Sequence, residues 1–351
     1  MPPSTAPVSF DDLRAFIERS FISCGMPGPD AQKAAALMAR ADLIGQDGHG
    51  VFRLPQYIRR IRAGGMNVAA QIRTVSERAA TALIDGDNGL GHLVMRHATE
   101  LAMEKAATTG VAWVGARNSN HAGPGSLYAA MPAQKDMIGI YIAVGSANHM
   151  PPWGGSEMLL STNPIAVAIP SANRPPIILD MATTVAAYGK VKTAAQRGEQ
   201  MPEGWMIDKE GRPLTDPQRA SEGFLLPIGG AKGYGLSLIF GILAGTLNGA
   251  AFGRDVIDFN ADSRSTTNTG HMIIALDIKA FTDPEAFKSG MDQIWEQMKS
   301  SPRLPGVDEI RLPGERLARV TQERSEKGIP LPLTLRKALN DLAGELAIAP
   351  L

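Results

Sequence analysis

Three side chains between residues 49 and 57 have the types that acid–base chemistry on a small organic acid requires. His49 stands between two glycines in the segment Asp47–Gly50, outside any regular periodic pattern. An imidazole in such a place keeps a pKa near neutrality and can exchange protons with a bound molecule. Arg53 has the planar fork that holds a carboxylate, and Tyr57 can donate a further hydrogen bond. A polar loop packed against a neighbouring lobe would explain the same residues, so both interpretations stay open.

Two polar segments follow predicted strands, where sites collect in α/β proteins. His121 lies in the glycine-rich loop Asn118–Gly125, which follows the apolar run Val111–Ala116. Asp180 ends the run Ile177–Leu179 and can serve as a polar anchor or as a helix N-cap. A turn whose polar side chains only satisfy backbone groups is the alternative for His121.

The segment Gly229–Gly235 is the best candidate for binding a phosphate. Its closely spaced glycines let backbone N–H groups approach an anion, a helix is expected directly after them, and Lys232 adds a positive charge. A tight strand-to-helix turn with a surface lysine is the alternative. Neither a G-x-G-x-x-G nor a G-x-x-x-x-G-K-[ST] pattern occurs, so a dinucleotide would need a fold other than the Rossmann fold.

Composition narrows the class of protein. The 351 residues include 35 basic and 35 acidic side chains, which leaves no broad positive field for nucleic acid or anionic lipid. Cys24 is the single cysteine, so we expect no disulfide, and no metal site is expected. His92, His97 and His271 are interpreted as structural or surface residues. We see no secretory signal and no membrane-length apolar run, which indicates a cytoplasmic protein.

The sequence pattern changes near residue 74 from helical periodicity to short β-branched runs, which predicts two lobes. Short β-branched runs indicate strands at Ala80–Asp85, Val111–Ala116, Ile138–Val144, Ile165–Ile169, Ile177–Leu179 and Met272–Leu276. Helical patterns cover both ends and part of the middle, with helices expected at Gln56–Arg62, His92–Thr108, Gly235–Leu247, Pro284–Met298 and Leu333–Leu346. Pro55 disfavours α geometry at Leu54, which leaves the register between Arg53 and Tyr57 uncertain. We therefore expect a helical domain from residues 1–73 and 284–351 and an α/β domain from residues 74–283.

Together these segments resemble the second type of malate/L-lactate dehydrogenase, over almost the whole chain. This family includes ureidoglycolate dehydrogenase, 2,3-diketogulonate reductase, sulfolactate dehydrogenase and Δ1-piperideine-2-carboxylate reductase. The resemblance rests on DGHGVFRLPQY (47–57), NSNHAGPGSLYA (118–129), PPWGG (151–155), STNPIAVAIP (161–170), DMATTVAAYGK (180–190), PEGWMIDKEGRPLTDP (202–217), LLPIGGAKGYGLSL (225–238), LPGER (312–316) and GIPLP (328–332).

The resemblance implies a non-Rossmann α/β cofactor-binding domain with a helical domain built from both chain ends. It implies hydride transfer between NAD or NADP and C2 of a small 2-oxo or 2-hydroxy acid. His49 would be the acid–base residue, His121 its catalytic partner, and Arg53 and Tyr57 the substrate-binding pair. The residues implied to line the cofactor are Ser146, Asp180, Met181, Ala182, Lys232, Gly233, Gly314, Glu315 and Arg316. A homodimer is also implied.

Two departures from the family pattern leave the substrate open. Gly48 stands where the family usually has serine, and the segment Ser146–Pro152 differs from the usual Asn/Thr-rich version. Reduction of a cyclic or N-alkyl imino acid is therefore an alternative reaction. An acid–base lyase or hydrolase and a catalytically inactive nucleotide-binding protein are more remote alternatives.

Overall fold

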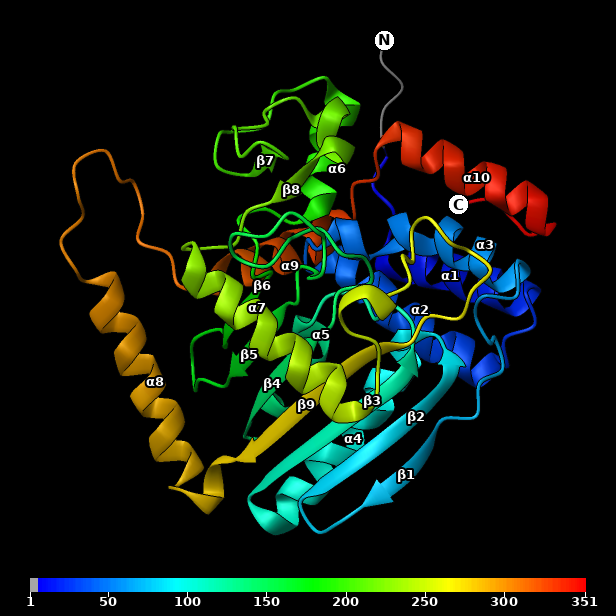
Figure 1. The fold of residues 1–351 in the computed structure, drawn as a ribbon. Coiled ribbons are helices and arrows are strands. Elements are labelled where there is room, and N and C mark those ends of the chain that lie inside the picture. The colour runs from blue at the N-terminus through cyan, green and yellow to red at the C-terminus, as the bar shows by residue number, and fades with distance from the viewer. Residues whose placement is uncertain (1–5) are drawn as a thin grey trace.

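A seven-stranded sheet organises the computed structural model, which describes residues 6–351 apart from the side chain of Gln196 (Figure 1). Its strands lie in the order β1 (Arg73–Glu77), β2 (Thr81–Gly89), β3 (Val111–Ser119), β9 (Thr269–Asp277), β4 (Met137–Ala143), β5 (Ile165–Ile169) and β6 (Ile177–Met181). Only β2 and β3 pair in parallel, and the other neighbours are antiparallel. A Rossmann fold has a parallel sheet, so the expected non-Rossmann α/β fold is confirmed.

Helices cover both faces of this sheet. α4 (Gly91–Thr109) and α5 (Ser126–Ala133) pack on one face and form with it a core rich in alanine. α7 (Ala231–Ala244) crosses the opposite face, where Ala244 packs with Ile142, Val144 and Met272 (Figure 1). A smaller unit combines α6 (Tyr188–Arg197) with the two-stranded sheet of β7 (Met206–Asp208) and β8 (Gly223–Leu225).

The two chain ends share a second core. It contains buried side chains from α1 (Phe10–Ser23), α2 (Gly28–Leu43), α3 (Leu54–Arg62) and α10 (Leu333–Leu346). Backbone bonds between Val8 and Ile329 tie the two ends together directly. Two further C-terminal helices, α8 (Pro284–Lys299) and α9 (Glu315–Lys327), lie outside this core, and Figure 1 shows α8 at the edge of the molecule.

The observed elements differ from the expected ones at five places that matter for function. α5, α6 and α9 are not anticipated by the sequence patterns, and α7 begins at Ala231 rather than at Gly235. The expectation about Pro55 is wrong, because Leu54 is helical with φ −55° and ψ −47° and Pro55 lies in the first turn of α3. Proline is tolerated there, since the first N–H groups of a helix have no intrahelical partner.

Among residues 6–351, no helix is both long enough and apolar enough to cross a bilayer. Residues 1–5, which belong to the N-terminus in which we see no secretory signal, lie outside the described residues.

Candidate active site

The structure brings His49, His121 and Tyr57 together from three separate elements. His49 Nδ1 lies 3.3 Å from His121 Nε2, and the Tyr57 hydroxyl oxygen lies 2.6 Å from His121 Nδ1. The two imidazole rings are nearly parallel, with centroids 5.3 Å apart. Because residues 49 and 121 lie far apart in sequence, only the packing of the two cores creates this pair.

The backbone indicates which ring nitrogens carry protons. The N–H of Gly123 donates to His121 Nδ1 at 3.3 Å, so this nitrogen accepts and the Tyr57 hydroxyl can also donate to it. A neutral His121 then carries its proton on Nε2, which can donate to His49 Nδ1. In this tautomer the remaining ring nitrogen, Nε2 of a neutral His49, carries an N–H that can donate a hydrogen bond.

The turn that carries His49 is held from two sides. The buried carboxylate of Asp42 on α2 accepts the N–H of Val51 at 2.7 Å. Arg324 on α9 forms an ion pair with Asp47 and also donates to the carbonyl of Asp42. At Gly50, a Cβ would overlap the Asp42 carboxylate, so glycine is the residue that allows this close approach.

Arg53 lies directly before α3 and faces the same site. Its guanidinium donates to the carbonyl of Gly48 at 3.0 Å, to Gln56 Oε1 at 2.9 Å and to Asn260 Oδ1 at 3.3 Å. Within the described chain, no carboxylate lies within 4.0 Å of this guanidinium. An arginine held by neutral acceptors and lacking a carboxylate partner is suited to bind a substrate carboxylate.

Burial shapes the electrostatics of the cluster. Burial, and then the nearby charge of Arg53, lowers the pKa of His49 to about 4. The pKa of His121 is lowered well below its usual range by the same two causes, and burial raises the pKa of Tyr57. Both histidines are therefore neutral near pH 7 in the free protein. A bound carboxylate would offset the charge of Arg53 and raise the pKa of His49 again.

Strand β6 contacts several of the segments that the family resemblance implies for cofactor binding. Asp180, near the end of β6, accepts the N–H of Ser126 at the start of α5 at 2.9 Å. The N–H of Ile178, two residues earlier on β6, donates to the carbonyl of Pro313 at 3.1 Å, which places the turn 314–316 beside this strand. Met181 and Ala182 are half-buried at the end of the strand.

The start of α7 lies beside the segment that follows β6. The N–H of Ile228 donates to the carbonyl of Thr183 at 3.0 Å, and the N–H of Val185 donates to that of Leu226 at 2.8 Å. Lys232 is exposed in the first turn of α7, and the buried Gly233 follows it. A helix N-terminus preceded by two glycines and carrying a lysine is a suitable phosphate site.

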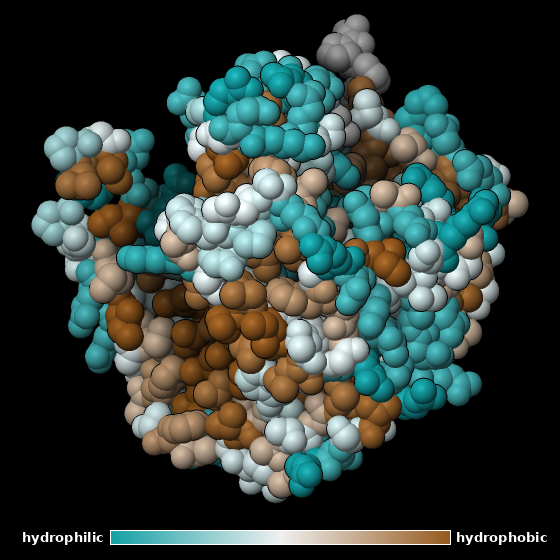
Figure 2. Space-filling model, viewed as in Figure 1, coloured by the Kyte–Doolittle hydropathy of each residue, from teal (hydrophilic) through white to brown (hydrophobic). Residues whose placement is uncertain are grey.

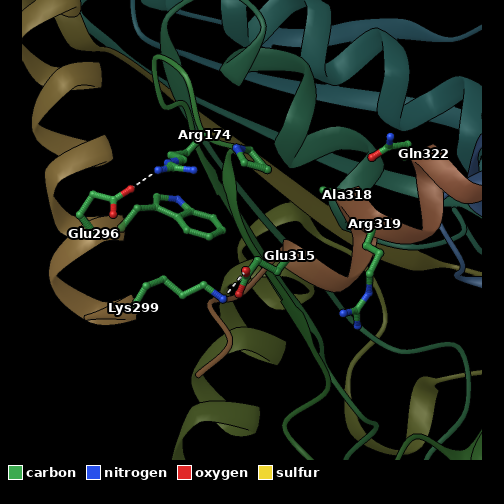
Figure 3. A pocket seen from close by; sticks show the side chains of 9 residues that line it. Arg174, Glu296, Lys299, Glu315, Ala318, Arg319 and Gln322 are labelled. Carbon is green, nitrogen blue, oxygen red and sulfur yellow. Dashed lines mark hydrogen bonds and ion pairs between the residues drawn. The ribbon is translucent and has the colours of Figure 1, made fainter. Parts of the chain in front are cut away.

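A cavity of about 430 Å³ opens beside the turn 314–316, between α8, α9 and the loop before β6 (Figure 3). Arg174 pairs with Glu296, and Lys299 Nζ lies 2.6 Å from Glu315 Oε1. The buried indole N–H of Trp295 on its wall has no hydrogen-bond partner. The cavity therefore combines one aromatic side chain with two ion pairs, next to the turn that the family resemblance implies for the cofactor.

Several residues of the site are not indicated by any sequence pattern. Phe259 packs against both His121 and Tyr57, with ring centroids 5.8 and 5.9 Å away, and its N–H donates to the carbonyl of Ser146 at 2.9 Å. His92 is fully buried edge-on to Tyr57, at 5.8 Å between centroids. The loop that carries Phe259 and Asn260 has no regular pattern, so only its tertiary contacts reveal it.

The other histidines and Gly48 have simple environments. His271 is buried in β9 and lies 2.8 Å from the Tyr141 hydroxyl, and His97 is exposed on α4. A Cβ at Gly48 would meet no atom within 4 Å. The serine that the family usually has there would therefore fit without any steric conflict.

A buried histidine pair and an arginine without a carboxylate partner, set in a non-Rossmann α/β fold, define an enzyme suited to acid–base chemistry on a small organic acid. Comparison with known families is more specific: residues 8–340 match the model described as malate/L-lactate dehydrogenase, and the chain belongs to this family. It is an NAD(P)-dependent oxidoreductase of 2-hydroxy and 2-oxo acids.

Individual relatives cover nearly the whole chain. The malate dehydrogenase of Pyrococcus horikoshii is 39% identical over 346 residues, which are 96% of this chain and 95% of the relative. The solved sulfolactate dehydrogenase of Methanocaldococcus jannaschii superposes with a TM-score of 0.90 at 37% identity, over 97% of this chain and 98% of that one. The Δ1-piperideine-2-carboxylate reductase of Pseudomonas syringae reaches a TM-score of 0.86 at 29% identity, over 96% and 99%.

Proposed function

We propose that His49 is the acid–base residue for hydride transfer at C2 of a 2-oxo or 2-hydroxy acid. The observation that carries this role is the pairing of His49 with His121, which is itself held by Tyr57. In reduction, the imidazolium form of His49, which the bound carboxylate favours by offsetting the charge of Arg53, donates a proton to the oxygen that forms at C2 and becomes a neutral imidazole. In oxidation, a neutral His49 accepts that proton and becomes the imidazolium. General acid catalysis of this kind contributes about 10²–10⁴-fold to a rate.

Arg53 binds the C1 carboxylate in this proposal, and Tyr57 keeps His121 in position. Fixing the carboxylate sets which face of C2 is turned toward the cofactor, which is a positioning effect. When bound, the nicotinamide supplies or accepts the hydride. Asp180, Met181, Ala182 and Ser146 would lie near the nicotinamide half, while Lys232, Gly233 and the turn 314–316 would hold the phosphates and the far end.

The test compares His49→Asn with the wild type and with His97→Asn, which changes an exposed histidine on α4. NADH and NADPH are each followed by absorbance with pyruvate, oxaloacetate, 2-oxoglutarate, sulfopyruvate and 2,3-diketogulonate. We expect His49→Asn to lower turnover by about 100-fold or more while NAD(P)H affinity changes little. Unchanged turnover would remove His49 from the mechanism. Tight cofactor binding without turnover of any acid by the wild type would support an inactive nucleotide-binding protein.

Reduction of an imino acid is the second candidate reaction. It is favoured by the structural likeness to the piperideine-2-carboxylate reductase. The same assay, run with the cyclic imines of pipecolate and proline and with pyruvate plus methylamine, separates the two. A higher kcat/KM for an imine than for every 2-oxo acid would select it.

We also propose that the protein is a homodimer joined through the outer face of α7. The side of α7 that meets the sheet carries the small residues Gly233, Ser237, Gly241 and Ala244, whereas Leu236, Ile239 and Ile242 are exposed. Figure 2 shows an apolar surface where Figure 1 places this helix. Monomers rarely expose an apolar surface of this kind.

Light scattering after size-exclusion chromatography tests the dimer. Ile239→Lys should convert the wild-type dimer into a monomer of 37.3 kDa. The matched control is Ile22→Lys, since Ile22 is similarly exposed but lies on α1. A wild-type mass equal to that of the monomer would contradict the proposal.

We keep the division into a helical domain (1–73 and 284–351) and an α/β domain (74–283) as part of the proposal. The first core supports the grouping of α1, α2 and α3 with α10, whereas α8 and α9 contribute no buried residue to it. A cytoplasmic location is likewise proposed, in keeping with the single unpaired Cys24. Limited proteolysis would test the boundaries, and fractionation of the source cells would test the location.

A further inference from the structure

Lys192 on α6 is a second cation near the substrate site. Its Nζ lies 5.6 Å from the ring centroid of Tyr188, one turn earlier on the same helix. In the described part of the chain, no carboxylate lies within 4.0 Å of this ammonium group.

Tyr188 connects Lys192 to the loop that borders the catalytic cluster. Its ring stacks on His149, with centroids 4.0 Å apart and an angle of 9° between the ring planes. His149 lies three residues after Ser146, whose carbonyl accepts the N–H of Phe259. Phe259 in turn packs on His121. The His149–Tyr188 stack, called the wall below, is therefore connected to His121 through the loop at Ser146 and through Phe259.

The positive charges of Lys192 and Arg53 act on each other. Burial, and then the guanidinium of Arg53, lowers the pKa of Lys192, while Asp258 opposes this effect. The carboxylate of Asp258 accepts the N–H groups of Asn260 at 2.7 Å and Ala261 at 3.2 Å and forms no ion pair with Lys192. Two neighbouring cations without carboxylate partners repel each other until an anion lies between them.

His149 adds a neutral donor to this region. Burial lowers its pKa to about 4, and Lys192 acts in the same direction, so the imidazole is uncharged near pH 7. A neutral imidazole carries one N–H that can donate to an anionic oxygen. The wall thus offers one ammonium group and one N–H donor in addition to the guanidinium of Arg53.

We propose that Lys192, with His149 beside it, binds the second anionic group of a dianionic 2-oxo acid while Arg53 binds its C1 carboxylate. The second group is a carboxylate or a sulfonate on the carbon chain beyond C2. Lys192 is therefore the residue that selects dianionic substrates over monoanionic ones. This inference rests on the proposed function for the role of Arg53.

The experiment compares the wild type with Lys192→Met, Lys192→Arg and Arg197→Met. Methionine keeps the length of the lysine stem without its charge, and Arg197→Met removes a cation from the same helix at an exposed position outside the wall. Each protein is assayed with NADH or NADPH and with oxaloacetate and sulfopyruvate as dianions and pyruvate as the monoanion. In Lys192→Met, a charge-assisted hydrogen bond to the second anionic group is lost. The kcat/KM for both dianions should therefore fall about 10- to 100-fold, mainly through KM.

Three further results belong to the same expectation. Pyruvate should change by less than about threefold in Lys192→Met, Lys192→Arg should recover most of the loss, and Arg197→Met should behave like the wild type. An equal loss for pyruvate and the dianions, or no loss at all, would overturn the proposal.

Calorimetry separates failure of this inference from failure of the proposed function. Succinate and propionate, which cannot be reduced at C2, are titrated into each protein with NAD⁺ or NADP⁺ present. Binding of succinate that weakens in Lys192→Met, with propionate unaffected, supports the dianion site even if the wild type reduces none of the acids. Equal succinate affinity in the wild type and Lys192→Met would overturn it.

Discussion

At the scale of single residues, the site depends on keeping two imidazoles neutral and oriented. Burial and Arg53 lower the pKa values of His49 and His121, and Gly123 and Tyr57 hold His121 by its Nδ1. Such outer contacts typically decide how well a catalytic group is aligned. Tyr57 therefore acts through His121 as well as near the substrate.

Tyr57→Phe tests this positioning role. Removing the hydroxyl deletes the 2.6 Å contact with His121 but keeps the buried ring. We expect kcat to fall about 10- to 100-fold, with NAD(P)H affinity unchanged. Steady-state kinetics with a cofactor titration checks it. A kcat equal to the wild-type value would show that Tyr57 has no part in orienting His121.

At the scale of elements, α7 differs from an ordinary surface helix, whose large apolar residues face the core. In α7 small residues face the sheet and large apolar residues are exposed. Gly233 lies where the helix approaches the preceding loop, and a Cβ there would overlap the carbonyl oxygen of Ile228. Gly235, two residues later, has open space around it. The same substitution at these two positions should therefore have opposite effects.

Gly233→Ala should lower the free energy of unfolding by about 1–3 kcal/mol, because the loop carrying Ile228 has to move. Gly235→Ala should be neutral or raise that free energy by up to about 1 kcal/mol, since alanine favours a helix over glycine. Urea unfolding measures both. NAD(P)H fluorescence should also show weaker cofactor binding for Gly233→Ala alone. Equal effects of the two variants would contradict this account of the start of α7.

At the scale of the whole molecule, several histidines are buried in the neutral form. Burial lowers the pKa of His49, His149 and His271 to about 4 and that of His92 to about 3. In the unfolded chain these groups have pKa values near 6.5. Below about pH 6.5 the unfolded state therefore binds more protons than the folded state, so acid favours unfolding.

Stability should fall as the pH decreases from about 6.5 toward 4, by at most about 1.4 kcal/mol per pH unit for each buried histidine. Above pH 6.5 the contribution of these groups is constant. Urea unfolding at pH 7, 6 and 5 checks the expectation. His92→Phe should make the dependence less steep, while the exposed His97→Gln should not alter it. A free energy of unfolding that is the same at pH 7 and pH 5 would refute it.

Local patterns in the sequence determined most of the elements and the residue types of the site. The run Ile165–Ile169 and the helix Leu333–Leu346 form with the predicted bounds, since their periodicity is strong and local. The glycine-bounded His49, Arg53 and the segment after residue 229 were recognisable as chemistry-bearing residues for the same reason. The family resemblance predicted the class of reaction.

Only the tertiary structure decided how these residues meet. The contacts of His49 with His121, of Asp47 with Arg324 on α9 and of Tyr188 with His149 join residues far apart in the chain. Periodicity reports which face of an element is buried, whereas these contacts depend on how two cores pack together. The sequence therefore determined which groups are available, and the packing decided which of them share a pocket and how far burial lowers their pKa values.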